Sequence, residues 1–185
     1  FQYTNQFGCT GSVDTSLTIH PIPTLSLGGL NQEKSYCQYK NAEPVILEGL
    51  HSGTGGVGKY FINNEELSAN ILDPAEYTGA INIRYEYTDE NGCFNDYHDT
   101  VTINPVPFVD FEVKNFCLPE TITIENKSPQ DQNIETWLWD FGDGISQQDS
   151  TYKNIVTHNY SSAGLQSISL SAVTDKGCEA DTLKR

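Results

Sequence analysis

Apolar and polar residues alternate over short stretches of the chain, most regularly in residues 81–87. The apolar members are Ile81, Ile83, Tyr85 and Tyr87, and the polar ones between them are Asn82, Arg84 and Glu86. A period of two places the apolar side chains on one face of a half-buried strand. Further strands are expected over residues 44–48, 59–62, 109–113, 121–125 and 136–141. No segment has convincing helical periodicity, so the pattern predicts an all-β sandwich.

A second strand carries the largest aromatic side chains. Trp137, Trp139 and Phe141 lie at i, i+2 and i+4, so an extended backbone places all three on one side. The next residues, 142–144, read Gly-Asp-Gly and tolerate the positive φ values of a tight turn. We therefore predict a core strand followed at once by a chain reversal.

A Gly-Cys pair recurs at residues 8–9, 92–93 and 177–178. The second pair follows the first by 84 residues, and the third follows the second by 85. Each pair precedes an Asp-Thr, and the first two are also followed by Pro-x-Pro, at residues 21–23 and 105–107. A period this regular predicts tandem domains of equal size, with each Gly-Cys in a turn between two closing strands.

The repeat predicts three parts. Residues 1–20 are expected to be the last strands of a truncated preceding domain, followed by domains at 21–104 and 105–185. Proline fixes φ and lacks an amide donor, so each Pro-x-Pro should end strand pairing and stiffen the link. The sequence begins at Phe1 and contains no Met, so we interpret it as an excised segment of a longer protein.

The aromatic strand and turn resemble the signature of PKD (polycystic-kidney-disease) domains, which are immunoglobulin-like β-sandwiches. That signature, Trp-x-Trp-Asp-Phe-Gly-Asp-Gly, matches Trp137, Trp139, Asp140, Phe141, Gly142, Asp143 and Gly144. The family's His-x-Tyr, a glycine and an alternating strand follow at residues 158–172. The resemblance implies a PKD domain over about the last eighty residues. The middle domain lacks the signature and resembles the divergent PKD-like repeats of Bacteroidota surface proteins, which implies tandem sandwiches.

Five cysteines follow the same repeat. Cys37 and Cys117 lie early in their domains, whereas Cys93 and Cys178 lie at the closing turns. We predict disulfides within each domain, Cys37 with Cys93 and Cys117 with Cys178, and a partner for Cys9 in the domain upstream. A zinc site is disfavoured because Cys-x-x-Cys is absent. Disulfides indicate an oxidising compartment, hence a periplasmic, cell-surface or extracellular location.

The charge balance excludes two classes of partner. With 10 basic and 25 acidic residues the formal net charge is −15. Nucleic acids and anionic membranes require a cationic face, so neither is expected. The sequence has no run of eighteen apolar residues, so no membrane insertion of this segment is expected either. Cations, sugars and proteins remain as partners.

Two motifs suggest ligands, and each has a structural alternative. Residues 53–59 match the first seven positions of a phosphate-binding loop, but Tyr60 stands where Ser or Thr should hold magnesium, and a strand is expected next. Asp140, Asp143 and Asp149 are candidate calcium ligands. The alternative, which we favour, is that Asp140 and Asp143 cap turn amides. No catalytic constellation is found, so we expect no enzyme activity and no cofactor.

The resemblance implies a non-catalytic stalk or spacer of a large adhesin, an exported and outer-membrane-associated bacterial protein. Gliding motility and type IX secretion are the implied context, and neighbouring repeats of the same chain are the implied partners. One alternative is a module that binds polysaccharide or cell-surface proteins. Its candidate residues are Tyr36, Tyr39, Tyr60, Tyr77 and Tyr97. The other is an accessory module of a secreted hydrolase.

Overall fold

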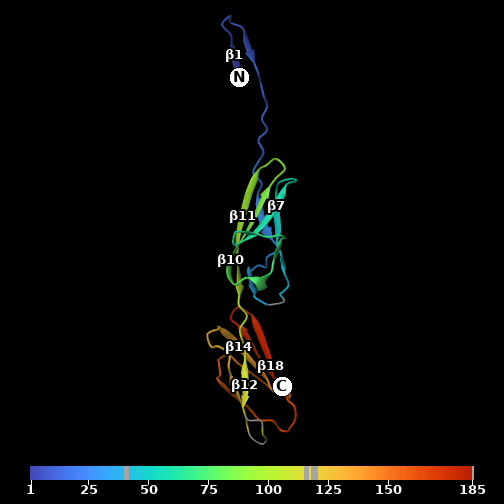
Figure 1. The fold of residues 1–185 in the computed structure, drawn as a ribbon, viewed down its shortest axis with the longest axis vertical. Coiled ribbons are helices and arrows are strands. Elements are labelled where there is room, and N and C mark those ends of the chain that lie inside the picture. Colours follow the sequence, from blue (N-terminus) through green and yellow to red (C-terminus); the bar gives the residue numbers. More distant parts are fainter. Residues whose placement is uncertain (40–41, 115–116, 118–120, 185) are drawn as a thin grey trace.

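The computed structural model describes residues 1–39, 42–114, 117 and 121–184. Figure 1 shows a hairpin, a middle group of strands and a second group of strands in succession along one long axis. The hairpin consists of β1 (Gln2–Thr4) and β2 (Thr10–Ser12) in antiparallel register. Within the described ranges, no helix is long and apolar enough to cross a membrane. The molecule is thus an extended series of β-rich parts.

The middle unit comprises strands β3 to β11. One sheet has the order β4 (Ser35–Cys37), β11 (Phe94–Asn104), β10 (Gly79–Thr88), β7 (Val57–Ile62) and β8 (Glu65–Glu66). Two further pairs are β3 (Leu25–Gly28) with β6 (Glu48–His51), and β5 (Val45–Ile46) with β9 (Ile71–Leu72). A short 3₁₀ helix, Pro74–Glu76, follows β9. The β4–β11 pair is parallel, whereas the other pairs are antiparallel.

The alternating pattern of residues 81–87 places β10 at the centre of this unit. Ile81, Ile83, Tyr85 and Tyr87 are each at most 2% exposed, which confirms the predicted half-buried strand. The facing β6 packs closely on them, because a Cβ added at Gly49 would lie 2.2 Å from the Tyr85 ring. The middle unit is therefore a sandwich with a core of its own.

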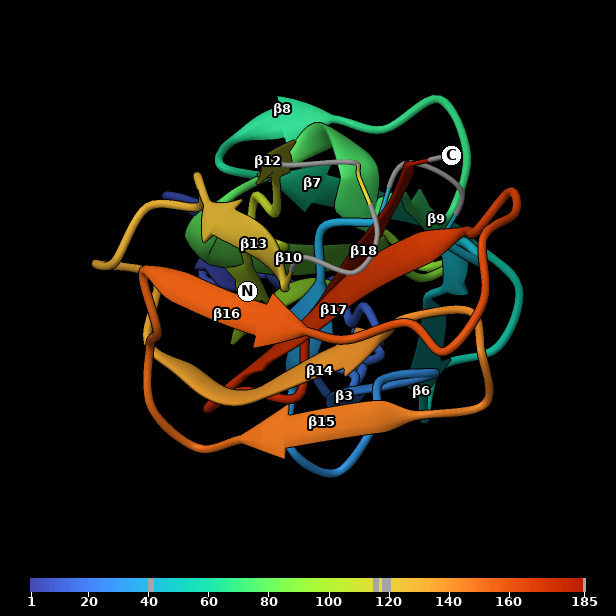
Figure 2. The ribbon, with the colours of Figure 1, turned by 90° about the horizontal axis from the view of Figure 1, so that it is seen from below.

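The C-terminal unit comprises strands β12 to β18 in two sheets. The first has the order β12 (Phe111–Lys114), β13 (Ile122–Asn126) and β16 (Ile155–His158). The second has the order β15 (Ser146–Asp149), β14 (Ile134–Asp140), β17 (Ile168–Thr174) and β18 (Glu179–Lys184). Figure 2 shows β13 and β16 on one side and β14 and β15 on the other.

The predicted aromatic strand forms the core of the C-terminal unit. Trp137, Trp139 and Phe141 are buried, and Trp139 meets the ring of Phe111 from the facing sheet edge-on at 5.4 Å. Because the two cores share no residue, the chain is built as tandem immunoglobulin-like β-sandwiches.

Candidate functional site

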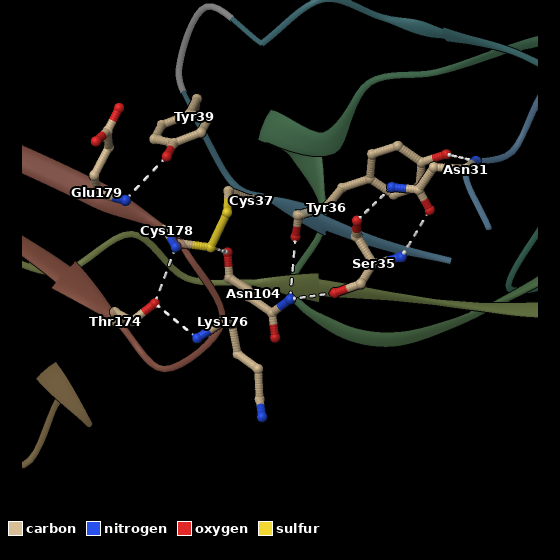
Figure 3. The surroundings of a disulfide bond; sticks show 10 residues. All are labelled: Asn31, Ser35, Tyr36, Cys37, Tyr39, Asn104, Thr174, Lys176, Cys178 and Glu179. Carbon is tan, nitrogen blue, oxygen red and sulfur yellow. Dashed lines mark hydrogen bonds between the residues drawn. A yellow bond between two sulfur atoms is a disulfide. The ribbon is translucent and has the colours of Figure 1, made fainter. Parts of the chain in front are cut away.

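A disulfide joins the middle unit to the C-terminal unit. Cys37 at the end of β4 is bonded to Cys178, which precedes β18, and their Cα atoms are 5.5 Å apart. Cys37 also lies opposite Asn104, the last residue of β11, from which the chain continues into the Pro-x-Pro link at residues 105–107. Figure 3 shows this joint disulfide beside the start of the link. Two covalent connections therefore cross the joint side by side.

Asn104 organises the middle-unit side of the joint. Its Nδ2 donates to Ser35 Oγ at 2.8 Å and to the Tyr36 carbonyl at 3.4 Å, so its side chain ties β11 to β4. The Asn104 carbonyl accepts a hydrogen bond from the backbone N–H of Gln38 at 2.8 Å. These bonds hold Cys37 next to the point where the chain leaves the unit.

Thr174 organises the turn that presents Cys178. Its Oγ1 accepts hydrogen bonds from the backbone N–H groups of Lys176, at 3.4 Å, and Cys178, at 3.1 Å. Its own N–H donates to the Cys178 carbonyl at 2.9 Å, and Gly177 supplies the positive φ of 74° that the reversal needs. The Cys178 side chain is fully buried against the middle unit, 3.9 Å from the Asn104 carbonyl oxygen.

A hydrogen bond reinforces the joint disulfide. The Tyr39 hydroxyl accepts from the backbone N–H of Glu179 at 2.9 Å, so the residue after Cys178 is also held by the middle unit (Figure 3). This N–H lies at the beginning of β18, where a strand amide without a ladder partner needs another acceptor. Tyr39 thus acts as a structural acceptor at the joint.

The predicted disulfides within each domain are wrong. Cys93 precedes β11, and Cys37 lies opposite the far end of that strand. Because a strand rises by about 3.3 Å per residue, the two cysteines are roughly 35 Å apart. A disulfide requires Cα atoms within about 7 Å. With all five cysteines among the described residues, Cys9, Cys93 and Cys117 are free. The pairs Cys37–Cys93 and Cys117–Cys178 are therefore replaced by Cys37–Cys178.

The sequence does contain a signal for the observed pair. Residues 94–104, between the Gly-Cys turn and the next Pro-x-Pro, contain no Gly or Pro that would interrupt a strand, which favours one long strand. Such a strand places its turn at the upstream end of the unit, next to the preceding link. Cys178 is then expected near the joint with the middle unit rather than near Cys117.

The PKD signature residues build a packed turn in the C-terminal unit. Asp140 Oδ1 accepts from the N–H of Gly142 at 2.8 Å, and Asp143 Oδ1 accepts from the N–H of Ile145 at 3.1 Å. The second oxygen of Asp143 lies 2.8 Å from Nε2 of His158, whose ring stacks on Phe141 at 4.0 Å. The predicted capping role of Asp140 and Asp143 is thus confirmed.

Gly142 cannot be replaced without strain. Its φ is 78°, and an added Cβ would lie 2.5 Å from the Ser167 carbonyl oxygen. Tyr160 covers the same turn, because its hydroxyl donates to the Phe141 carbonyl at 2.7 Å. The signature is therefore explained by packing and capping of one turn.

The third candidate calcium ligand is engaged elsewhere. Asp149 lies in β15 and accepts a hydrogen bond from Gln147 Nε2 at 2.7 Å, and it also pairs with Lys153. Across the described ranges, no three His, Cys, Asp or Glu side chains form a group that could hold a metal ion. Calcium binding was the less favoured alternative, and it stays untested.

Hydrogen bonds to lysine and histidine side chains lower the pKa of carboxyl groups in the C-terminal unit. The bond to Lys184 lowers the pKa of Asp110, the bond to a neighbouring lysine lowers that of Glu112, and the bond to His158 lowers that of Asp143. All three groups are therefore more acidic in the folded chain than in the unfolded one.

We expect the C-terminal unit to lose stability as the pH falls below about 4. A lowered folded-state pKa contributes stability above the unfolded value, here 3.8 for Asp and 4.5 for Glu, and this stability is lost as the folded group protonates. The urea midpoint, followed by the fluorescence of Trp137 and Trp139, should be lower at about pH 3 than at about pH 6. Asp143→Asn should reduce this difference, and an equal or higher midpoint at acid pH would contradict the assignment.

The tyrosines proposed to bind sugar make hydrogen bonds and core contacts within the folded chain. All five candidates, Tyr36, Tyr39, Tyr60, Tyr77 and Tyr97, are half-buried. The Tyr36 hydroxyl accepts from the N–H of Asn31 at 2.7 Å, and the Tyr60 hydroxyl accepts from the N–H of Gly49 at 2.8 Å. Tyr36, Tyr60 and Tyr77 also pack on the core of the middle unit. Their geometry does not form an exposed aromatic platform.

The glycine-rich segment leads into a strand, as predicted. β7 begins at Val57 and contains Tyr60, so no helix N-terminus follows the glycines. Gly56 has a φ of 87°, and an added Cβ would lie 2.2 Å from the Thr88 carbonyl oxygen at the end of β10. The segment is a tight loop packed on the sheet.

An apolar pocket of about 370 Å³ lies in the C-terminal unit. Its lining includes Val113, Ile122, Leu165 and Ile168, with Cys117 also on its wall. The sequence did not predict this pocket. Its lining offers apolar contact and a thiol, and it lies apart from the joint disulfide.

Comparison with known proteins assigns the C-terminal unit. Residues 104–184 match the family model of the PKD domain. No curated protein matches the chain. This part of the chain is a PKD-like domain, as the resemblance of Trp137–Gly144 predicted.

Several solved structures are similar to the chain. The PKD1 domain of Vibrio anguillarum Epp is 27% identical, and the match covers 44% of this chain and 90% of that domain with a TM-score of 0.38. The PKD1 domain of the Vibrio cholerae metalloprotease PrtV is 31% identical, with 43% and 91% covered and a TM-score of 0.36. A calcium-stabilised adhesin with which an Antarctic bacterium binds ice is 12% identical, with 98% and 53% covered and a TM-score of 0.45.

Proposed function

We propose that this chain is a non-catalytic extracellular spacer, in which consecutive β-sandwich domains are held end to end by a disulfide across their joint. The domain boundaries belong to this proposal: residues 1–20 end one domain, and 21–104 and 105–185 form the next two. The observation that carries it is the Cys37–Cys178 bond between the two units. A disulfide at this place holds two domains relative to each other rather than shaping a binding surface.

The joint disulfide restricts bending. A single link at residues 105–107 allows the two units to swing in any direction about it. With a second covalent connection through Cys178, the two units can rotate only about the line that joins the two connections. The Tyr39–Glu179 hydrogen bond opposes that remaining rotation. The joint therefore keeps the units in one orientation, which a spacer needs in order to hold a distance.

The chemistry of the chain supports an extracellular or cell-surface location. A disulfide between two domains persists in an oxidising compartment and is reduced in the cytosol. A net charge of −15 makes neighbouring copies repel one another, which favours an extended, soluble array. Both properties suit an adhesin-like repeat segment.

The proposal also includes the class of protein to which these residues belong. The divergent middle unit supports assignment to Bacteroidota surface adhesins, with outer-membrane association, gliding motility and type IX secretion as the implied context. Sequencing of the native polypeptide that contains residues 1–185 tests this assignment. A parent without further PKD-like repeats would contradict it.

Neighbouring repeats of the same chain are the partners that this proposal requires. A polysaccharide or a cell-surface protein is the alternative partner, but the half-buried tyrosines of the middle unit lend it no support. A glycan array probed with the disulfide-bonded protein, with and without calcium, tests that alternative. Saturable binding lost in Tyr97→Ala would favour recognition over spacing.

Distance measurement between the units tests the spacer proposal. Ketone-bearing residues introduced at Glu65 and Gln148, both exposed, accept nitroxide labels without using cysteine. Pulsed electron spin resonance should give one narrow distance distribution for the oxidised protein and a broader one after reduction. A variant with Cys9, Cys93 and Cys117 changed to Ser should behave like the parent. A distribution that is broad before reduction would contradict a fixed joint.

A further inference from the structure

The turn that carries Cys93 has the same construction as the turn that carries Cys178. Asp89 Oδ1 accepts hydrogen bonds from the N–H groups of Asn91, at 2.9 Å, and Cys93, at 2.8 Å. The Asp89 N–H donates to the Cys93 carbonyl at 3.0 Å, and Thr174 makes the corresponding bond to Cys178 at 2.9 Å. In both turns a side-chain oxygen four residues before the cysteine fixes the backbone.

The two sulfur atoms also face equivalent places. Cys178 Sγ lies 3.9 Å from the carbonyl oxygen of Asn104, and Cys93 Sγ lies 4.0 Å from that of His20. Asn104 and His20 each immediately precede a Pro-x-Pro. Because Cys37 lies opposite Asn104, the partner of Cys178 comes from the strand beside that residue. Cys93 therefore faces the place where an equivalent partner would lie beside His20.

The N-terminal hairpin has the construction of a closing hairpin. Asn5 Oδ1 accepts hydrogen bonds from the N–H groups of Phe7 and Cys9, both at 3.0 Å, as Asp89 does in the middle unit. The hairpin and the segment after it also carry apolar residues at positions that are core positions in the middle unit. Phe1, Leu17 and Ile19 are 93%, 84% and 85% exposed, whereas the residues 84 positions later, Tyr85, Val101 and Ile103, are buried. This apolar face fits the core of a further sandwich.

We propose that Cys93 forms a second joint disulfide, with a cysteine at the position of Cys37 on a preceding unit of the same fold. Residues 1–20 would be the closing strands of that unit, as Phe94–Asn104 closes the middle unit. This inference extends the proposed spacer, because it makes the joint disulfide a repeating connection rather than a single one. It would let each domain hold its two neighbours covalently.

The bond forms by thiol–disulfide exchange. The two thiols lose two protons and two electrons, and the electrons reduce a protein disulfide of the oxidising compartment to two thiols. The new S–S bond replaces the one that is broken, so sulfur, protons and electrons balance. No metal or cofactor takes part in this exchange.

Differential alkylation of the native, full-length protein tests the proposal. Free thiols are first blocked with N-ethylmaleimide in denaturant, disulfides are then reduced, and the released thiols receive iodoacetamide. Trypsin places Cys93 on peptide 85–114 and Cys178 on peptide 177–184, so their masses report separately. We expect both cysteines to carry the iodoacetamide mass. In residues 1–185 produced alone, Cys93 should instead carry the maleimide mass, whereas Cys178 should not.

The unreduced digest identifies the partner. Peptide 85–114 should be linked to a cysteine peptide from outside residues 1–185, upstream in the same chain. Maleimide on Cys93 of the native protein would overturn the inference, as would a link to peptide 35–40 or to a second copy of peptide 85–114. Protection of Cys178 with a reactive Cys93 would overturn this inference alone and leave the proposed function intact.

Discussion

Reduction of the joint disulfide is expected to release roughly 480 Å of additional chain when the protein is stretched from its two ends, at roughly 3.4 Å per extended residue. Cys37 and Cys178 are 141 residues apart in the sequence. While the bond is intact, tension passes from the N-terminus to Cys37, across the sulfur atoms, and from Cys178 to the C-terminus. Strands β5 to β17 lie inside the closed loop and cannot be pulled out.

Single-molecule force spectroscopy with and without a thiol reductant measures this release. The oxidised protein should show short extensions from the segments outside the loop, and the reduced protein should add the full length of the loop. With residues 1–185 as the stretched protein, Cys93→Ser is the matched control, because it removes a cysteine that is free there from an equivalent turn and should leave both results unchanged. An extension that does not depend on reductant would contradict a bond between Cys37 and Cys178.

Cys178→Ser is expected to lower the free energy of unfolding of the C-terminal unit by about 2–5 kcal/mol. The disulfide closes a loop of 141 residues, and removing it restores conformational freedom to the unfolded chain. Both tryptophans, Trp137 and Trp139, lie in this unit, so their fluorescence during urea denaturation reports its unfolding selectively. The midpoint should shift to lower urea concentration.

Two controls separate the lost bond from other effects of the substitution. Cys37→Ser removes the same bond from the other unit, so the double variant should be little less stable than either single one. Cys93→Ser in residues 1–185 should change stability by no more than about 0.5 kcal/mol, because Cys93 is free there. An equal loss in Cys93→Ser, or additive losses in the Cys37 and Cys178 variants, would contradict the assigned pair.

The cores were predictable because their signals are local. Tyr87 and Trp139 each belong to a run in which every second residue is apolar, and one strand then decides which side chains are buried. The capping roles of Asp140 and Asp143 were predictable for the same reason, since each carboxylate bonds an amide two residues away. Such features need no knowledge of the neighbouring unit.

The disulfide at the joint was not predictable from the equivalence of cysteine positions in the two repeats alone. The repeat correctly matched Cys93 with Cys178 and placed both at closing turns, but a repeat does not say which end of a unit a turn occupies. That depends on the direction of β11 and on its parallel pairing with β4, a contact between residues far apart in sequence. The role of Tyr39 was not predictable either, because its bond to Glu179 crosses the joint between residues far apart in the sequence.

Peptide mapping without reduction tests the central claim most directly. Trypsin places Cys37 on peptide 35–40, Cys178 on peptide 177–184 and Cys93 on peptide 85–114. A fixed joint between the two sandwiches predicts a disulfide-linked species of peptides 35–40 and 177–184 that disappears on reduction. A link between peptides 35–40 and 85–114 would place the bond within the middle unit and contradict the account.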